Sequence, residues 1–223
     1  MPNASTSFFG WVAFLLEKYG MLFLRGTGMT LLIALTGTAL GFALGLLVAI
    51  IRTIALPEKK KTGSNTGVVI RRALLQFVQL LMNVYIQVFR GTPMIVQAVV
   101  IYYGAQYAGV FMDTTFAAIF IISINTGAYM AEIIRGGIVS VDKGQFEAAH
   151  AIGMTHWQTM TTVVLPQAIR NILPSVGNEL IVNIKDSSVL NVISVSELFF
   201  QAKSAAGTYY RYFEVYFIIA VIY

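Results

Sequence analysis

The chain has 223 residues, of which 57% are hydrophobic and only 11% are charged. Soluble domains carry about a quarter charged residues, so this composition is typical of a membrane protein. The chain has no cysteine, which excludes disulfides, thiolate metal sites and a cysteine nucleophile. Its net charge of +5 comes largely from basic residues that flank a hydrophobic span, where they normally set orientation. We therefore expect no nucleic-acid partner.

Residues 8–23 are aromatic and aliphatic, with Glu17 and Lys18 in the middle. This pattern fits a helix in the membrane interface or, equally, the outer turns of the first span, and we expect residues 1–21 to form an outer interfacial segment. The apolar stretch precedes the first positive charge, which is the reverse of a secretory signal. We therefore expect no cleaved leader.

Three stretches without a charged residue are near or above the roughly 20 apolar residues that cross a bilayer as a helix. They cover residues 26–51, 91–112 and 114–131. In the first stretch Gly37, Gly41 and Gly45 follow one another at four-residue spacing. Small residues at this spacing line one side of a helix and predict that a second helix packs closely there.

The longest basic run, PEKKKTGSNTGVV at residues 57–69, has the composition of a solvated loop. Lysine-rich loops stay in the cytoplasm, which places the amino terminus outside. Counting Lys and Arg in all loops supports this orientation, because the inner basic residues outnumber Lys18, Arg25, Lys203 and Arg211 on the outer side. The inner set is Arg52, Lys59, Lys60, Lys61, Arg71, Arg72, Arg135, Lys143 and Arg170.

Residues 76–110 are expected to return outward as a bent span. The bend is predicted at the motif RGTP, residues 90–93, because proline has no N–H to donate to the preceding turn and glycine adds flexibility. Beyond it, Tyr102, Tyr103 and Tyr107 fit an aromatic belt at the outer surface.

The rest of the chain alternates between spans and polar stretches. Residues 115–134 run back as the third span, and residues 135–166 are too polar to cross and are predicted to form a cytoplasmic loop. A fourth span begins near residue 169, followed by a polar outer stretch at 198–211. Residues 212–223 begin a fifth span that, at 1.5 Å rise per residue, falls far short of the ~30 Å core. We expect this last helix to be truncated.

Two kinds of catalytic or binding site are not expected. No phosphate-binding loop of the form GxxxxGK[ST] occurs, and the nearest stretch, GSNTG at residues 63–67, lacks the lysine. We therefore predict no catalytic residue and no ATP hydrolysis by this chain. His150 and His156 stand six apart, which is not the i, i+4 spacing of helical metal ligands, and we expect no metal site.

The predicted cytoplasmic loop contains a pattern suited to docking on a partner protein. Small alanines give a short helix a smooth face, a glycine after it allows a joint, and a proline marks the far boundary. A glutamate at the start offers a carboxylate to a basic residue of the partner, although it also favours the dipole of its own helix. The residues of this pattern are Glu147, Ala148, Ala149, Gly153, Leu165 and Pro166.

Residues 147–166 resemble the coupling-loop signature of ABC importer permeases: Glu-Ala-Ala, three residues, Gly, nine residues, Ile, one residue, Leu-Pro. The only departure is Val163 in place of Ile. Three further stretches resemble the polar amino acid branch of that family, the histidine, glutamine, arginine and cystine permeases. They are RGTP at 90–93 with Gln97, NTGAYMAEIIRGG at 125–137, and GNE through KDSS at 177–188.

The resemblance implies an all-α, polytopic membrane protein with five transmembrane helices of the type I ABC importer permease fold, amino terminus outside. It implies that residues 1–223 are a single permease domain that pairs with a second copy or a sister permease in a prokaryotic cell membrane. It also implies two cytoplasmic ATPase subunits and an extracytoplasmic amino acid binding protein. ATP and Mg²⁺ would bind to the ATPase, with no cofactor in this chain. Residues 147–153 would sit in a cleft of the ATPase.

Ionisable side chains inside membrane spans are costly and by default suggest a function. Glu179, Asn183 and Asp186 recur at i, i+4 and i+7, which puts them on one face of the fourth span. Together with Asn178 and Ser187 they are candidates to meet the amino group or carboxylate of an amino acid. Alternatively, the neighbouring lysine at position 185 neutralises a carboxylate of this cluster and makes it structural.

A second polar stripe lies on the third span, where Asn125, Tyr129 and Glu132 also recur at i, i+4 and i+7. Glu132 with Arg135 at i+3 fits a local ion pair as well. The complete set of pathway candidates is Gln97, Asn125, Tyr129, Asn178, Glu179, Asn183, Asp186 and Ser187.

An alternative function is an ATP-independent secondary carrier or channel for small polar solutes, in which Glu179 and Asp186 relay ions or protons. The chain lacks the paired interrupted segments of an inverted-repeat carrier. A purely structural membrane subunit is a third possibility, but it leaves the polar side chains inside the spans without a role. Proton or sodium coupling would indicate the carrier, and dependence on an ATPase partner would indicate the importer.

Overall fold

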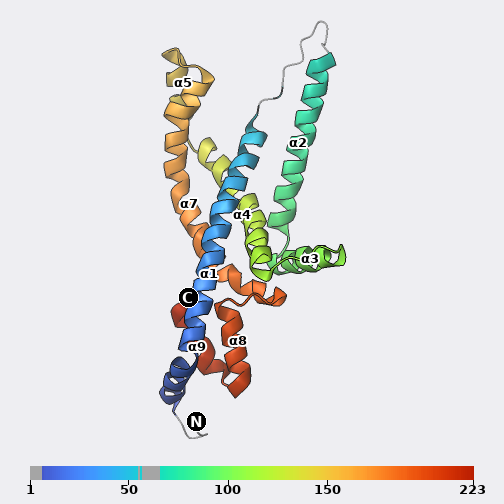
Figure 1. Ribbon diagram of the computed structural model, residues 1–223. Helices are drawn as coiled ribbons and strands as arrows, with labels where there is room; N and C mark the ends of the chain where they lie inside the picture. The colour runs from blue at the N-terminus through green and yellow to red at the C-terminus, as the bar shows by residue number, and fades with distance from the viewer. Residues whose placement is uncertain (1–6, 55, 57–65) are drawn as a thin grey trace. The chain divides into compact units, whose positions relative to one another are not determined.

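The computed structural model describes residues 7–54, 56 and 66–223, and all regular elements in these ranges are helical (Figure 1). The all-α prediction is confirmed for this part of the chain. Most of the basic run at 57–69 lies outside the described residues. The elements are α1 (Phe8–Thr53), α2 (Thr66–Gly91), α3 (Met94–Tyr107), α4 (Thr114–Val139), α5 (Lys143–Ala151), α6 (His156–Gln158), η1 (Thr159–Val164), α7 (Leu165–Asp186), η2 (Ser187–Ile193), α8 (Leu198–Tyr209) and α9 (Tyr212–Ile222).

Three of these helices, α1, α2 and α4, are long and apolar enough to cross a membrane. Helix α1 continues without interruption from Phe8 to Thr53, so residues 8–23 and the first span form one helix of 46 residues. The expected bend at residues 90–93 is a complete break, because α2 ends at Gly91 and α3 begins at Met94. Proline at position 93 has no N–H, so the helical hydrogen-bond ladder stops there.

The chain divides into two compact units, and α1, α4 and α7 contribute to both. The first unit comprises Met1–Thr38, Met94–Ile122 and Leu180–Tyr223, and the second comprises Ala39–Pro93 and Ser123–Glu179.

Two apolar clusters form the core of the first unit. In one, Leu15 and Phe23 of α1 pack against α8 and α9. In the other, Ile33 of α1 packs against α3, the first half of α4 and η2, where Leu190 is fully buried. Close packing of these side chains provides van der Waals attraction between the helices of this unit.

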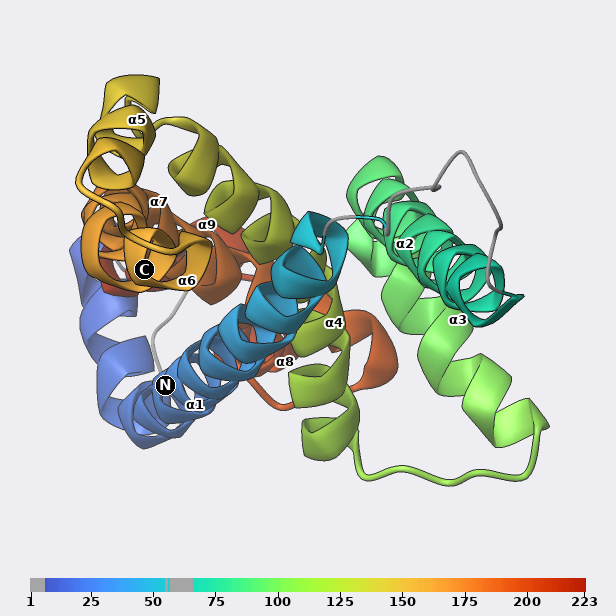
Figure 2. The same cartoon turned by 90° about the horizontal axis from the view of Figure 1, so that it is seen from above.

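The second unit has smaller clusters along the inner parts of its helices. Val48 of α1 and Ile86 of α2 pack on alanines of α4. Further along, Ile134 of α4 contacts Ile172 of α7, and a separate cluster joins α5 to η1 and α7. In Figure 2, α5, α6 and the start of α7 are seen together in yellow and orange.

The glycine stripe of α1 packs closely on α4, as its spacing predicts. A Cβ atom added at Gly37 would lie 2.5 Å from Ile122 Cγ2, within the first unit. In the second unit, a Cβ atom at Gly41 would lie 2.7 Å from Thr126 Cβ. These distances are shorter than van der Waals contact, so only glycine permits this approach of the two helices.

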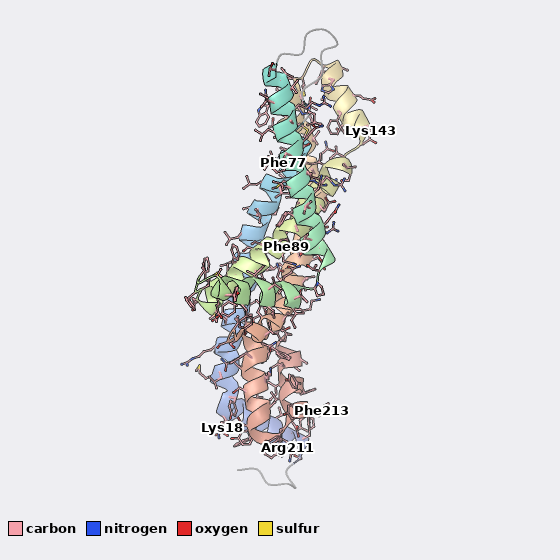
Figure 3. The ribbon with its side chains drawn as sticks, turned by 90° about the vertical axis from the view of Figure 1, so that its right-hand side faces the viewer. Lys18, Phe77, Phe89, Lys143, Arg211 and Phe213 are labelled. Atoms are coloured by element: carbon pink, nitrogen blue, oxygen red, sulfur yellow. The ribbon has the colours of Figure 1, made fainter. Side chains whose placement is uncertain are left out.

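Helix α2 exposes a continuous series of apolar side chains along its length, of which Phe77 is labelled in Figure 3. No part of its most apolar window is buried inside the described chain. An exposed apolar surface of this extent is typical of a helix that contacts lipid or another chain. The remaining members include Val69, Ile70, Leu74, Leu80, Leu81, Val84 and Val88.

The polar outer stretch expected at 198–211 is largely a helix, α8. Helix α8 begins at the N-cap Glu197, whose carboxylate accepts hydrogen bonds from the amides of Phe199 (2.8 Å) and Phe200 (2.7 Å). Its buried face is made of alanines that pack against α9, among them Ala202 and Ala205. Alanine is a weak hydropathy signal, so the sequence analysis missed this amphipathic face.

Aromatic and basic residues gather at one end of the first unit, where Figure 3 labels Lys18, Arg211 and Phe213. The ammonium of Lys18 donates to the hydroxyl of Tyr209, and the guanidinium of Arg211 lies 4.4 Å from the centre of the Trp11 ring. Such clusters are common at membrane–water interfaces, because they combine an apolar body with a polar end.

Candidate functional site

The segment predicted to dock on a partner begins with a short capped helix. The carboxylate of Asp142 caps α5 by accepting from the amide of Gly144 at 2.7 Å. At the other end Gly153 has φ +82°. Its amide donates to His150 O at 3.0 Å, and the amide of Met154 donates to Ala149 O at 3.0 Å. These two bonds form a Schellman motif, which requires a left-handed residue at the glycine position.

The three residues of the Glu-Ala-Ala motif have different environments on α5. Glu147 and Ala148 are exposed, and the carboxylate of Glu147 makes no ion pair with any described residue. Ala149 is buried against a cluster that includes Val164 and Phe146. One face of α5 is therefore held by its own chain, and the opposite face is open to a partner.

Two large apolar side chains flank the Schellman glycine and are exposed to solvent. Ile152 is 78% exposed and Trp157 is 75% exposed. Trp157 is held in the short helix α6 by a capping box between Thr155 and Gln158. The sequence analysis did not single out these side chains, because single apolar residues are common at protein surfaces. Aromatic residues such as Trp157 are nevertheless enriched at protein interfaces.

The Leu165-Pro166 pair lies where η1 passes into α7. Residues Thr159–Val164 form a π-helix, and the amide of Leu165 donates to Met160 O, five residues back. Pro166 has no N–H to close a regular turn on the carbonyl four residues earlier, which accounts for the wider turn. Proline is also well tolerated in the first turn of a helix, so the same residue lets α7 begin.

Helix α5 is fixed to the start of α7 by both apolar and polar contacts. The apolar cluster contains Val141, Val164 and Ala168. The amide of Gln167 lies 3.4 Å from the side-chain oxygen of Gln145. Helix α5 and the start of α7 are therefore in direct contact.

Most polar candidates on α7 and at the start of η2 are buried or half-buried. Asn183 is 2% exposed and donates to Thr38 Oγ1 at 2.8 Å, within the first unit. Ser187 is fully buried and donates to Ile184 O at 2.8 Å. Asp186 is half-buried and Asn178 is exposed, whereas Glu179 is 8% exposed. Asn183 thus joins α7 to α1, in addition to any role in a pathway.

The polar stripe of α4 lies in the second unit and divides into two parts. Asn125 is buried and donates to Phe89 O of α2 at 3.3 Å, and Tyr129 is half-buried. Glu132 accepts from Arg135 Nη2 at 2.9 Å, which confirms the local ion pair, and also from Arg52 of α1. The sequence did not reveal the second arginine, because it lies 80 positions away.

The predicted pathway residues fall in both compact units. Gln97 of α3 is buried in the first unit, which also holds Asn183, Asp186 and Ser187. Asn125, Tyr129, Asn178 and Glu179 belong to the second unit. Among the described residues, no cluster of three or more His, Asp or Glu side chains is suited to a metal ion.

Three apolar helices of spanning length, followed by a capped and partly exposed polar segment, are typical of a helical membrane protein. Residues 63–223 match the model of the family described as "Binding-protein-dependent transport system inner membrane component", and the chain belongs to this family.

Similar proteins agree with this assignment. The chain is 37% identical over 204 residues to the glutamine transport system permease protein GlnP of Escherichia coli K12, covering 91% of this chain and 84% of that one. It is similarly 37% identical over 200 residues to the probable amino-acid ABC transporter permease protein YckA of Bacillus subtilis, covering 90% and 80% of the two chains.

Solved structures share the fold. A chain of the structure described as an amino acid ABC transporter with histidines superposes with a TM-score of 0.81 at 39% identity, over 93% of this chain and 88% of that chain. An inward-facing structure of the MetNI methionine ABC transporter gives a TM-score of 0.69 at 21% identity, over 92% and 90%. The second similarity concerns the fold alone.

Proposed function

We propose that the chain is the transmembrane permease subunit of an ATP-driven ABC importer for polar amino acids. The observation that carries this proposal is the two-sided environment of α5 within a chain of this permease family. Ala149 attaches the helix to its own subunit, while Glu147 and Ala148 face outward. The names of the relatives, which concern glutamine and other amino acids, support the substrate class.

In this proposal an ATPase subunit binds the surface around α5, with Ile152 and Trp157 as apolar anchors and Glu147 paired to a basic residue. Closure of two ATPase subunits on ATP displaces α5 and, through its packing on Val164 and Ala168, the start of α7. ATP then favours one of two permease conformations, which is a population shift. The chain itself carries no catalytic residue and no cofactor, and ATP with Mg²⁺ binds to the partner.

The proposed complex has two permease subunits, either two copies or this chain with a sister permease. Two ATPase subunits and an extracytoplasmic amino acid binding protein complete it. Five spans are assigned to α1, α2 with α3, α4, α7 and α9, with the amino terminus outside, in a prokaryotic cytoplasmic membrane. Residues 1–223 form the permease domain, residues 1–21 its outer interfacial segment, and residues 135–166 the cytoplasmic coupling segment.

The proposed pathway is lined by polar side chains of α3, α4, α7 and η2. Carboxylates and amides suit the amino group and carboxylate of an amino acid. The pathway set is Gln97, Asn125, Tyr129, Asn178, Glu179, Asn183, Asp186 and Ser187.

The test is purification of the tagged chain from its native membrane in mild detergent, with its partners identified by mass spectrometry. We expect a stoichiometric ATPase to copurify with the wild type. Trp157→Ala should reduce this copurification at least several-fold, because aromatic anchors contribute strongly to interfaces. Phe111→Ala, at an 82% exposed residue between α3 and α4, is the matched control and should retain the ATPase.

Two results would contradict the proposal. If the chain purifies without an ATPase and supports uptake in vesicles without ATP, it is a carrier, and Glu179 and Asp186 become relay candidates. If the ATPase copurifies equally well with Trp157→Ala and with a second variant, Glu147→Lys, the docking surface is elsewhere.

A further inference from the structure

Glu197, the N-cap of α8, is a fully buried acidic residue of the first unit. No basic side chain among the described residues forms an ion pair with it. A buried carboxylate is costly unless hydrogen bonds satisfy its oxygens. The contacts that this carboxylate makes therefore indicate what it does in the protein.

Capping of α8 accounts for only part of these contacts. The amide of Phe199 donates to Glu197 Oε2, and the amide of Phe200 donates to Oε1. Shorter side chains such as aspartate, asparagine and serine are preferred for this task. The longer glutamate makes one further contact, because the hydroxyl of Tyr223 at the end of α9 donates to its Oε2 at 3.1 Å. The additional length of the side chain thus serves a bond between α8 and α9.

The hydroxyl of Tyr223 connects this bond to two further elements of the first unit. Its oxygen lies within hydrogen-bonding reach of the hydroxyls of Thr30 of α1 and Ser187 of η2. Thr30 Oγ1 also accepts from the amide of Leu198, the first residue of α8, at 3.3 Å. Helices α8 and α9 pack side by side as a hairpin (Figure 1). The polar network therefore joins this hairpin to α1 and to the start of η2.

An open cavity of about 300 Å³ lies beside the network. Lys185 and Ser188, which are close to Ser187 in the sequence, line one part of it, and Phe199 and Tyr223 line another. The distance between η2 and the α8–α9 hairpin thus sets the width of this cavity, and the bonds of the Tyr223 hydroxyl fix that distance. The other lining residues are Tyr216, Ile219 and Ala220 of α9.

We infer that Glu197, acting through Tyr223, is a positioning residue for the proposed pathway, because it fixes the α8–α9 hairpin relative to Ser187. This inference rests on the proposed function, which places Ser187 in the pathway. Glu197 itself does not touch the amino acid. A hydrogen bond to a charged group is strong in a buried site, so one such bond holds the hairpin in place. Loss of this bond lets η2 shift and weakens binding of the amino acid.

The experiment measures equilibrium binding of tritiated L-glutamine and L-arginine to the purified permease–ATPase complex in detergent. Thermal unfolding is followed on the same samples. Tyr223→Phe removes only the hydroxyl and should weaken binding roughly 3- to 10-fold, the usual net contribution of one hydrogen bond. The matched control is Tyr212→Phe, at an exposed tyrosine in the first turn of α9, which should bind as the wild type does.

Two substitutions of Glu197 separate positioning from capping. Glu197→Asp keeps a carboxylate for the amides of α8 but is one methylene shorter, so it should keep the melting temperature and lose affinity as Tyr223→Phe does. Glu197→Gln keeps the length, but its NH₂ group cannot accept from the amide of Phe200. It should therefore retain most of the affinity and lower the melting temperature. A purely structural role predicts instead that affinity and melting temperature fall together in both variants.

The outcomes separate the inference from the proposed function. If the wild type binds neither amino acid, the substrate class is wrong, and both are overturned. If the wild type binds and Tyr223→Phe binds equally well, only the inference is overturned. The double variant Glu197→Asp/Tyr223→Phe should bind no more weakly than either single variant, and additive losses would also overturn the inference. If Glu197→Asp does not copurify with the ATPase, wild-type affinity in Tyr223→Phe is sufficient to overturn it.

Discussion

Glu132 of α4 is paired with both Arg52 of α1 and Arg135 of its own helix, so one carboxylate joins two helices that are distant in sequence. The side chains of Arg52 and Glu132 are only 22% and 19% exposed. The side-chain amide of Gln79 donates to Ile51 O at 3.2 Å and Ile54 O at 3.0 Å, which brings α2 to the same place. The end of α1 is thereby connected to both α2 and α4 in the second unit.

Removing the central carboxylate should therefore destabilise the protein. We expect Glu132→Gln to lower the free energy of unfolding by roughly 1–2 kcal/mol, between the values for exposed and buried ion pairs. Thermal unfolding in detergent measures the loss, and a double-mutant cycle with Arg52→Gln isolates the pair. The exposed Glu17 supplies a control, Glu17→Gln, which should have little effect. A coupling near zero would show that the pair is not energetically significant.

Gly41 should not tolerate even one additional methyl group. In Gly41→Ala the new Cβ atom would lie 2.7 Å from Thr126 Cβ, which forces α1 and α4 apart. We expect a loss of about 1–3 kcal/mol from overpacking, measured by thermal unfolding in detergent. The matched substitution Gly28→Ala, where nothing lies within 4 Å, should instead stabilise the helix by roughly 0.5–1 kcal/mol. Equal effects at the two glycines would disprove the close packing.

A substitution of Gly153 tests the backbone conformation of this residue rather than the space around it. No atom lies within 4 Å of an added Cβ atom, but φ is +82°. Gly153→Ala should cost roughly 1–2 kcal/mol, the penalty of a left-handed residue. Gly153→Asn should cost less, since asparagine tolerates this conformation. ATPase activity of the complex and thermal unfolding can be measured on the same samples. If both variants retain stability but lose substrate-stimulated ATPase activity, the glycine surface itself contacts the partner.

Asp113 precedes α4 and should make stability depend on acid pH. Its carboxylate accepts from the amides of Phe116 (3.1 Å) and Thr115 (2.8 Å), and these hydrogen bonds lower its pKa. A depressed pKa stabilises the fold above the ordinary pKa of aspartate, and this contribution is lost as pH falls through the lower, folded-state value. The stabilisation by the Asp113 carboxylate is therefore lost below about pH 4.

The measurement that checks this pH dependence is the difference in melting temperature between wild type and Asp113→Ala, followed from pH 7 to pH 3. The difference should be constant at neutral pH and shrink at the acid end. A difference that grows as pH falls would contradict the assignment.

Much of the helical architecture was predictable from local patterns. Charge-free stretches indicated apolar helices, and the four-residue spacing of Gly37, Gly41 and Gly45 indicated a close helix contact. The motif from Glu147 to Pro166 indicated the family. The helix α8 was missed because its buried face is mainly alanine, which differs little in hydropathy from its surroundings.

The sequence by itself determined the helical class, the apolar spans and the coupling motif, because these depend on composition and on spacing within one helix. Only the tertiary structure decided which partner each face meets. Arg52 finds Glu132, Asn183 finds Thr38, and Arg90 lies on Tyr129. Periodicity places a side chain on one side of a helix, but the partner is chosen by packing between segments far apart in the chain, where the sequence has no local signal.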